Sequence, residues 1–174
     1  LDDDSLEATL DTDSVNAVIG IYAGRDLQIF TKGGEFFLAQ SDLDPITPSN
    51  IVIRTSTKRG AKAGIKPVGA ESGTYFIQRT GKAIREFLFS DVDLSYVTPN
   101  ISLLSSHLIS APSDMALRKA TSTDDGDLLC IINSTDGSLI TYSILRGQNV
   151  VAPSLCTTNG KFINLGVDVD TLYF

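Results

Sequence analysis

The sequence contains the same hairpin pattern at several places, and this pattern limits the folds that the chain can adopt. Residues 74–89 (TYFIQRTGKAIREFLF) and 128–144 (LLCIINSTDGSLITYSI) each consist of two alternating apolar runs joined by a polar turn with glycine. Residues 18–30 (VIGIYAGRDLQIF) form a looser copy that turns at residues 24–26. Alternation predicts half-buried strands, and the glycine turns predict antiparallel hairpins. We therefore expect stacked antiparallel units rather than a fold built around one catalytic cleft.

Strand-like runs separated by turn residues continue through the rest of the chain. Beyond the three hairpins we expect strands at residues 35–40, 51–57, 115–122, 148–156 and 161–168. Short strands at this spacing are typical of a sandwich, a barrel or a propeller. Gly81 and Gly137 lie 56 positions apart, and removing the helical segment between them leaves a period near the ~40 to 50 residues of a propeller blade. The expected fold class is all-β, with antiparallel meander blades in a partial β-propeller-like arrangement.

One short helix is expected near residues 99–109. Thr98 can cap this helix and Pro99 suits its first position, while Asn100 is an alternative cap. Its apolar face is predicted from three residues at α-helical spacing, namely Ile101, Leu104 and Leu108. We expect this face to lie across the edge or the end of the sheets.

The excess of acidic over basic residues is concentrated at the start of the chain. Residues 1–13 contain six carboxylates and no basic residue, and the net charge of the whole chain is −7 at pH 7. We interpret residues 1–13 as an acidic arm or linker and residues 14–174 as a β-propeller-like fragment of a larger protein. The missing initiator Met and the strand-like end are the reasons for expecting a fragment. A net acidic surface repels phosphate backbones and disfavours general nucleic-acid binding.

The residue types that usually carry catalysis or metal binding are few. Cys130 and Cys156 lack metal-ligand or redox spacing, and we expect both to be small packed residues. The single histidine, His107, lies beside the apolar face of the expected helix and is interpreted as structural. No GxSxG, P-loop or HExxH motif and no membrane-spanning apolar run is present. We predict no catalytic residue, no cofactor, no metal site and no enzymatic activity.

Two glutamates leave one enzymatic alternative open. Glu35 and Glu86 are flanked by aromatic residues, in GGEFF and REFLF. If their carboxyl groups converge within about 10 Å, they could serve a hydrolase that acts on cell-wall sugar. Otherwise each lies on the polar face of a strand, with Arg85 on the opposite face from Glu86 by alternation.

A short basic segment offers a candidate contact surface. Residues 58–67 (KRGAKAGIKP) contain four basic residues and two glycines within ten positions. One interpretation is a mobile basic loop, and the other is a contact for an acidic partner surface, such as the acidic arm of a neighbouring copy. The candidate partner contacts are Lys58, Arg59, Lys62 and Lys66.

Six segments, spread over nearly the whole chain, carry a family resemblance. In chain order they are DDDSLEATL, VNAVIGIYAGRDLQIFTKGGEFFLAQ, LDPITPSNIVIRTSTKRG, VGAESGTYFIQRTGKAIREFLF, YVTPNISLLSSHLI and LLCIINSTDGSLITYSI. The most diagnostic stretch is QRTGKAIREF, followed by a tyrosine ahead of PNISLLSSHLI. This order resembles the recurrent core of the tail tubular protein B, or tail nozzle, of short-tailed bacteriophages and of related phage tail proteins. Tyr22 and Phe36 stand where that pattern usually carries Trp.

The resemblance implies a virion structural protein with β-propeller-like blades, located in the tail and assembled in the host bacterial cytoplasm. Such a protein is similar to a subunit of a homo-oligomeric, six-fold ring that contacts other tail subunits and lets DNA pass without specific binding. We therefore predict a structural component of a phage tail that acts through contacts between subunits. The alternative prediction is a receptor- or carbohydrate-binding β module on a virion.

Overall fold

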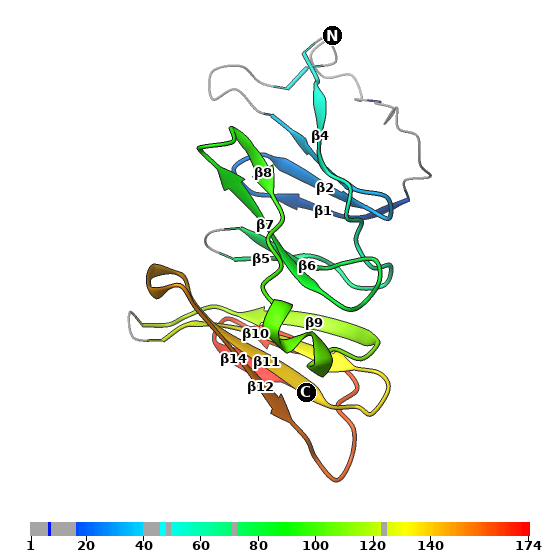
Figure 1. Ribbon diagram of the computed structural model, residues 1–174, viewed down its shortest axis with the longest axis vertical. Helices are drawn as coiled ribbons and strands as arrows, with labels where there is room; N and C mark the ends of the chain where they lie inside the picture. Colours follow the sequence, from blue (N-terminus) through cyan, green and yellow to red (C-terminus); the bar gives the residue numbers. More distant parts are fainter. Residues whose placement is uncertain (1–6, 8–16, 40–45, 48–49, 71–72, 123–124) are drawn as a thin grey trace.

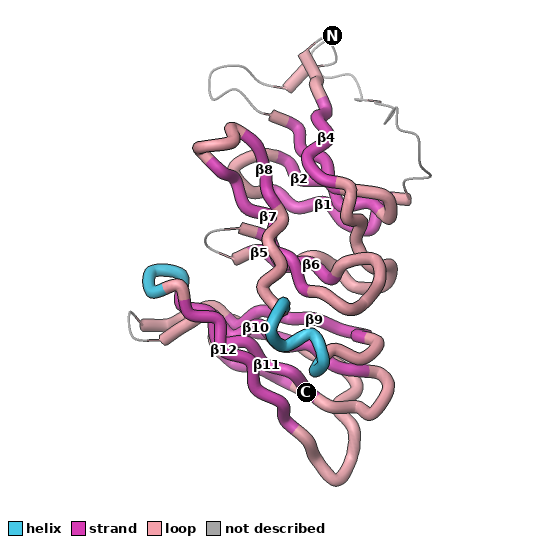
Figure 2. The backbone as a smooth tube through the Cα atoms, viewed as in Figure 1, coloured by secondary structure: helices cyan, strands magenta, loops and turns pink. Residues whose placement is uncertain are grey.

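The protein is built from three consecutive antiparallel sheets and a final hairpin (Figure 1). The computed structural model describes residues 7, 17–39, 46–47, 50–70, 73–122 and 125–174. Each of the three sheets has four strands in sequential order, and Figure 2 shows the strands stacked in layers with few helical residues. The predicted all-β class is confirmed. The acidic arm predicted over residues 1–13 lies, apart from Glu7, outside the described residues.

The strands follow the chain without crossovers. Sheet 1 consists of β1 (Val18–Ala23), β2 (Leu27–Thr31), β3 (Glu35–Leu38) and β4 (Ile53–Thr57). Sheet 2 consists of β5 (Val68–Gly69), β6 (Thr74–Ile77), β7 (Ile84–Ser90) and β8 (Ser95–Val97). Sheet 3 consists of β9 (Pro112–Arg118), β10 (Asp127–Asn133), β11 (Leu139–Leu145) and β12 (Val150–Cys156). The final hairpin pairs β13 (Gly166–Asp168) with β14 (Thr171–Tyr173).

The repeated hairpins occupy equivalent places in two of the sheets. β6–β7 and β10–β11 are the central pairs of sheets 2 and 3, as the sequence pattern predicts. Their turn residues Gly81 and Gly137 have φ angles of +68° and +71°, which glycine adopts without steric penalty. The looser copy forms β1–β2, an outer pair. The central pair of sheet 1 is β2–β3, so the position equivalent to Gly81 lies in the Gly33-Gly34 turn.

Alternation along the strands gives sheets 2 and 3 a buried core on each face. On β7, Phe87 packs toward sheet 1, whereas Ile84 packs toward sheet 3. On β10, Ile131 packs toward sheet 2, whereas Cys130 packs beneath the segment that carries the final hairpin. Strands buried on both faces have nearly continuous apolar runs, which explains the sequence of β10. Each fully buried large apolar side chain contributes roughly 1.5 to 3 kcal/mol.

The predicted helix is shorter than expected and is not an α-helix. It is a 3₁₀ helix, η1 (Leu103–Leu108), and Thr98 does not cap it. Asn100 Oδ1 instead accepts hydrogen bonds from the backbone N (3.0 Å) and the hydroxyl (2.9 Å) of Ser102 just before the helix. The predicted apolar face is wrong at Leu104, which is 94% exposed.

The three-residue turn of a 3₁₀ helix explains this difference. Residues three apart share a face in such a helix, so the inward positions are Ser102, Ser105 and Leu108. Ser102 and Ser105 are buried, and Leu108 packs against the core between sheets 2 and 3. The Ser105 hydroxyl lies 2.9 Å from the Tyr142 hydroxyl, so a buried serine takes the place expected for an apolar residue.

The expected strand at residues 161–168 is also shorter than predicted, since only Gly166–Asp168 pairs as a strand. Phe162 and Leu165, which precede it, pack against the outer face of sheet 3. A second 3₁₀ turn, η2 (Arg146–Gln148), connects β11 to β12. The described residues contain no helix that is both long enough and apolar enough to cross a bilayer.

Candidate functional site

The predicted basic segment lies at one end of the sheets, where several connections meet. The turns of β2–β3, β6–β7 and β10–β11 all lie on the right-hand side in Figure 1, as does the connection from β4 to β5. The β4–β5 connection runs between sheets 1 and 2. Ala61 N donates to Thr31 O (2.8 Å), and Arg79 N donates to Gly60 O (2.8 Å). The basic segment is therefore joined to the central turns of both sheets.

These bonds argue against the interpretation of residues 58–67 as a mobile loop. Lys62 N donates a further hydrogen bond to Ile77 O (2.9 Å), and Ala61 forms a β-bridge with Gln78. Ala61 and Ile65 bury their side chains in the two cores that flank sheet 2. The backbone of the segment is a fixed part of the fold, while its basic side chains face outward.

The structure adds three basic residues to the four predicted contacts. Lys58, Arg59 and Lys66 are exposed and Lys62 is half-buried. The turns beside them contribute three further exposed cations. We call this set the basic end: Lys32, Lys58, Arg59, Lys62, Lys66, Arg79 and Lys82. It contains seven of the 14 basic residues of the chain.

The charges of the basic end are not neutralised within the described part of the chain. The ion pairs among those residues are Arg25–Asp91, Arg118–Asp125 and Arg146–Glu86, and none of them includes a member of the basic end. Cations on adjacent turns that form no ion pairs produce a positive local potential, even in a protein with a net charge of −7. The basic end is therefore suited to bind an anionic partner.

Glu35 lies beneath the basic end and holds part of it in place. Its side chain is fully buried at the start of β3. Its Oε2 atom accepts hydrogen bonds from the Thr57 hydroxyl (2.5 Å) and from the backbone N of Arg59 (3.2 Å). Burial raises the pKa of Glu35, and these hydrogen bonds offset part of that rise. Glu35 thus fixes the path of the chain as it leaves β4.

Arg85 extends from β7 toward the same region. Its Nε atom donates to Gln78 Oε1 (2.7 Å), and Nη1 donates to Thr98 O (2.6 Å). Burial lowers the pKa of Arg85, the positive charge of Arg59 lowers it further, and Glu35 partly opposes the change. Arg85 is held by neutral acceptors and not by a direct ion pair among the described residues.

The next residue of β7, Glu86, points to the opposite side of sheet 2. It is fully buried and forms an ion pair with Arg146 of η2, which belongs to the sheet 3 side of the molecule. Arg85 and Phe87 face sheet 1, so Glu86 and Glu35 are separated by sheet 2 itself. The two carboxylates therefore do not converge, and the hydrolase alternative fails on its own geometric condition.

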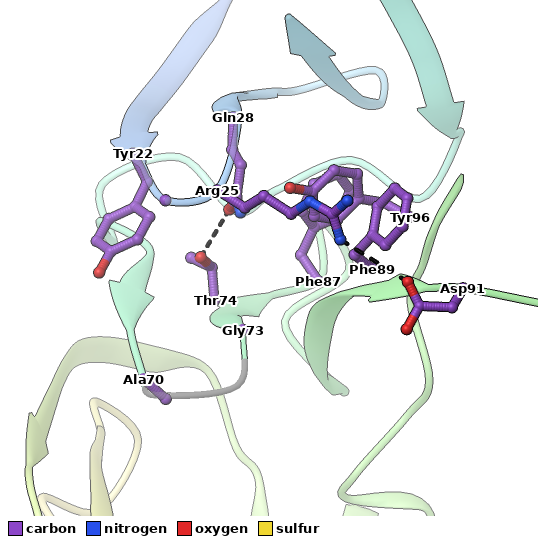
Figure 3. Close-up of a pocket in the computed structure, with 11 residues that line it drawn as sticks. Tyr22, Arg25, Gln28, Ala70, Gly73, Thr74, Phe87, Phe89, Asp91 and Tyr96 are labelled. Atoms are coloured by element: carbon purple, nitrogen blue, oxygen red, sulfur yellow. Dashed lines mark hydrogen bonds and ion pairs between the residues drawn. The ribbon is translucent and has the colours of Figure 1, made fainter. Parts of the chain in front are cut away.

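A pocket of about 280 Å³ lies at the other end of sheets 1 and 2 (Figure 3). Its rim carries Arg25, whose guanidinium carbon is 4.2 Å from the centre of the Phe89 ring and whose Nη1 is 3.8 Å from Asp91 Oδ1. In its floor the Thr74 hydroxyl donates to Gln28 Oε1 (2.6 Å). The pocket combines aromatic surface with a few polar groups, which is the usual composition of a small-molecule site.

Tyr96 closes the inner wall of this pocket as a structural residue. Its ring stacks on Phe87 with 4.4 Å between the ring centres, and its hydroxyl donates to Asp26 Oδ2 (2.8 Å). Burial and the neighbouring Asp26 carboxylate raise the pKa of Tyr96 to about 12. The phenol therefore remains protonated at neutral pH and acts as a hydrogen-bond donor.

The histidine and one cysteine lie elsewhere than the sequence predicts. His107, interpreted from the sequence as a packed or hydrogen-bonded structural residue, is exposed on η1 and therefore not packed. Cys130 is buried as expected, and burial raises its pKa to about 11, which keeps the unreactive thiol form at neutral pH. Cys156 is exposed, contrary to prediction. Within the described ranges no group of three or more His, Cys, Asp or Glu side chains could hold a metal ion.

No protein-family model matches the chain, and no curated protein matches it significantly. Sequence reasoning missed Lys32, Arg79 and Lys82 as members of the basic end. A usable signal was present, because each of them lies within two residues of a glycine in a central hairpin turn.

Proposed function

We propose that this chain is a non-enzymatic structural component of a phage tail, of the nozzle or tube type, that acts through contacts between subunits. The observation that carries the proposal is the regular stack of four-stranded meanders. The first strands of neighbouring sheets lie together, β5 against β9, and so do the last strands, β4 against β8. Successive blades of a propeller are related in this way, which agrees with the resemblance of the sequence segments to tail proteins.

The physical properties of the stack suit a load-carrying wall. Sheets 2 and 3 are covered on both faces, so neighbouring layers support each other through continuous side-chain packing. The basic end supplies a fixed, charged contact surface for other tail subunits. In the proposed assembly the subunits form a homo-oligomeric ring, a hexamer by resemblance, on the virion tail.

Electron microscopy of the purified protein, combined with analytical ultracentrifugation, tests this proposal. We expect ring-shaped particles with a central channel that increase in number with protein concentration. A protein that stays monomeric at all concentrations and shows no affinity for other tail proteins would contradict the proposal.

A second candidate function is a receptor- or carbohydrate-binding module on a virion, and the pocket in Figure 3 favours it. Tyr22 and Phe89 offer aromatic surface, and the Arg25–Asp91 pair offers polar groups that can bond to sugar hydroxyls. A glycan array probed with the parent protein and with Arg25→Ala tests this candidate. Binding that is lost in the variant supports it, whereas an array with no bound glycan contradicts it.

A further inference from the structure

We propose that the basic end is a binding surface for an acidic peptide, and that the acidic segment formed by residues 1–13 of the same chain occupies it. The proposal does not depend on the tail assignment, and a tail subunit that contacts the basic end must first displace this segment. It concerns the two most strongly charged parts of the chain, which have opposite signs. The basic end has seven cations, and residues 1–13 have six carboxylates with no basic residue.

The path of the chain brings these two parts close together. The described structure resumes at Ala17, whose carbonyl oxygen accepts a hydrogen bond from the backbone N of Lys32 (3.0 Å). The chain therefore enters sheet 1 at the basic end, beside one of its cations. Asp13 is four positions before Ala17, and four residues span at most about 14 Å. The last carboxylate of the acidic segment can thus reach the basic end without any movement of the sheets.

The whole segment is also long enough to cover the basic end. Sixteen residues precede Ala17 and can span up to about 50 Å when extended, whereas neighbouring packed sheets lie only about 10 Å apart. A ligand attached by a short flexible linker has an effective concentration on the order of millimolar. A peptide with modest affinity for the basic end is therefore bound most of the time when it belongs to the same chain.

The surface itself is well prepared to bind such a peptide. The backbone of residues 58–67 is fixed by hydrogen bonds to both neighbouring turns, so binding orders only basic side chains. The cations of the basic end form no ion pairs with carboxylates in the described part of the chain, so no internal ion pair must break. An acidic peptide is favoured over a nucleic acid, because the six carboxylates of residues 1–13 belong to the same chain and repel a phosphate backbone that approaches the basic end.

Fluorescence anisotropy with a labelled peptide tests the proposal. The peptide has the sequence LDDDSLEATLDTD of residues 1–13. It is titrated with the parent chain and with a neutralised full-length chain. The neutralised chain carries amides in place of the six carboxylates at Asp2, Asp3, Asp4, Glu7, Asp11 and Asp13. We expect the neutralised chain to bind the peptide at low salt more than about tenfold more tightly than the parent, because the parent's own segment competes. Raising the salt from 0.05 to 0.5 M should weaken binding.

Matched substitutions locate the surface. In the neutralised chain, Lys58→Gln with Lys82→Gln removes two exposed cations of the basic end. Two surface ion pairs contribute about 2- to 30-fold in affinity, and we expect a loss in that range. The control, Arg54→Gln with Lys119→Gln, removes two exposed cations outside the basic end and should change the affinity less than about twofold. Circular dichroism melting checks that both variants are folded.

Four results would overturn the proposal. The first is no peptide binding to the neutralised chain at low salt, and the second is an equal loss in the control variant. The third is tight binding of a labelled DNA duplex that the peptide does not displace, which assigns the surface to nucleic acid. The fourth is concentration-dependent dimers of the parent that disappear in the neutralised chain, because the occupant would then be the segment of a second copy.

Discussion

The two interfaces that flank sheet 2 are built from different kinds of side chain. Between sheets 1 and 2 the core is aromatic, and it buries several polar residues beside the rings. The rings belong to Phe30, Phe37, Phe76, Phe87 and Tyr96, and the polar residues include Gln28, Glu35 and Thr74. Between sheets 2 and 3 the core is mainly aliphatic, with members such as Ile77, Ile84, Leu129, Ile131 and Ile140.

This difference indicates that the two interfaces contribute differently to stability and to geometry. An aliphatic interface gains free energy mainly from the apolar area that it removes from water, with little preference for direction. Aromatic pairs and buried hydrogen bonds depend on angle and distance, so they favour one arrangement of two layers over others. We infer that the interface between sheets 2 and 3 contributes most of the stability, whereas the interface between sheets 1 and 2 fixes the geometry around the basic end.

The largest expected effect is a cavity in the aliphatic interface. Ile131 is fully buried between sheets 2 and 3, so Ile131→Ala should lower the free energy of unfolding by about 4 kcal/mol, within the usual range for such substitutions. Urea titration followed by circular dichroism measures the change. Leu104→Ala, at a side chain that is 94% exposed, is the control and should change stability by less than about 0.5 kcal/mol. Similar losses in the two variants would contradict the assignment of Ile131 to the core.

The next effect comes from the ion pair between sheet 2 and η2. Arg146→Ala removes the cation beside the buried Glu86 carboxylate and should destabilise the protein by about 3 kcal/mol. The double variant Arg146→Leu with Glu86→Leu removes both charges and should recover most of that loss. The urea midpoints of the parent, the single variant and the double variant show whether the loss is recovered. A double variant as unstable as the single one would show that packing, and not charge, is responsible.

Smaller losses of stability are expected when the hydroxyl of either buried tyrosine is removed, and the two losses can be compared. Tyr96 donates to the Asp26 carboxylate in the aromatic interface, whereas Tyr142 shares a hydrogen bond with the neutral Ser105 in the aliphatic one. Hydrogen bonds to charged groups contribute about twice as much as neutral ones. We expect losses of about 2 kcal/mol for Tyr96→Phe and about 1 kcal/mol for Tyr142→Phe in thermal unfolding. The reverse order would remove the distinction between the two interfaces.

The smallest effect depends on pH and concerns Glu35. Its raised pKa means that the folded protein binds this proton more tightly than the unfolded chain does. The stability contributed by this group is therefore complete below the ordinary pKa of 4.5 and falls as the pH rises toward the raised value. The stability of Glu35→Gln relative to the parent should increase across this window in urea titrations. Asp168→Asn, at an exposed carboxylate, is the control. A difference between Glu35→Gln and the parent that does not change with pH would contradict the buried position of Glu35.

Most of the strands could be predicted from the sequence, because their signal is local. The hairpins around Gly81 and Gly137 combine alternation with turn glycines, and both are present. β8 is only three residues long, too short for alternation to stand out, and we expected no strand there. η1 was predicted with α-helical spacing, and its inward residues follow the spacing of a 3₁₀ helix instead.

The candidate site could be predicted only in part, because its members come together through the packing of separate layers. Lys58, Arg59, Lys62 and Lys66 are neighbours in the sequence and could be proposed together. Lys32, Arg79 and Lys82 join them only when the turns of sheets 1 and 2 lie side by side. The separation of Glu35 from Glu86 likewise depends on which sheet each strand faces, and no single strand contains that information.

The covering of sheets 2 and 3 on both faces has a mechanical consequence. Most backbone hydrogen bonds run within each sheet, and residues 58–67 add a few that join sheets 1 and 2. The remaining contacts between layers are made largely by side chains. A pulling force along the stack therefore acts on short-range side-chain packing, which yields over a small extension. A force within the plane of a sheet acts on rows of hydrogen bonds. The force needed to separate the layers by pulling along the long axis should therefore be lower than the force needed to unfold a sheet by pulling within its plane. Under a pull along the long axis the layers should separate while each sheet remains intact.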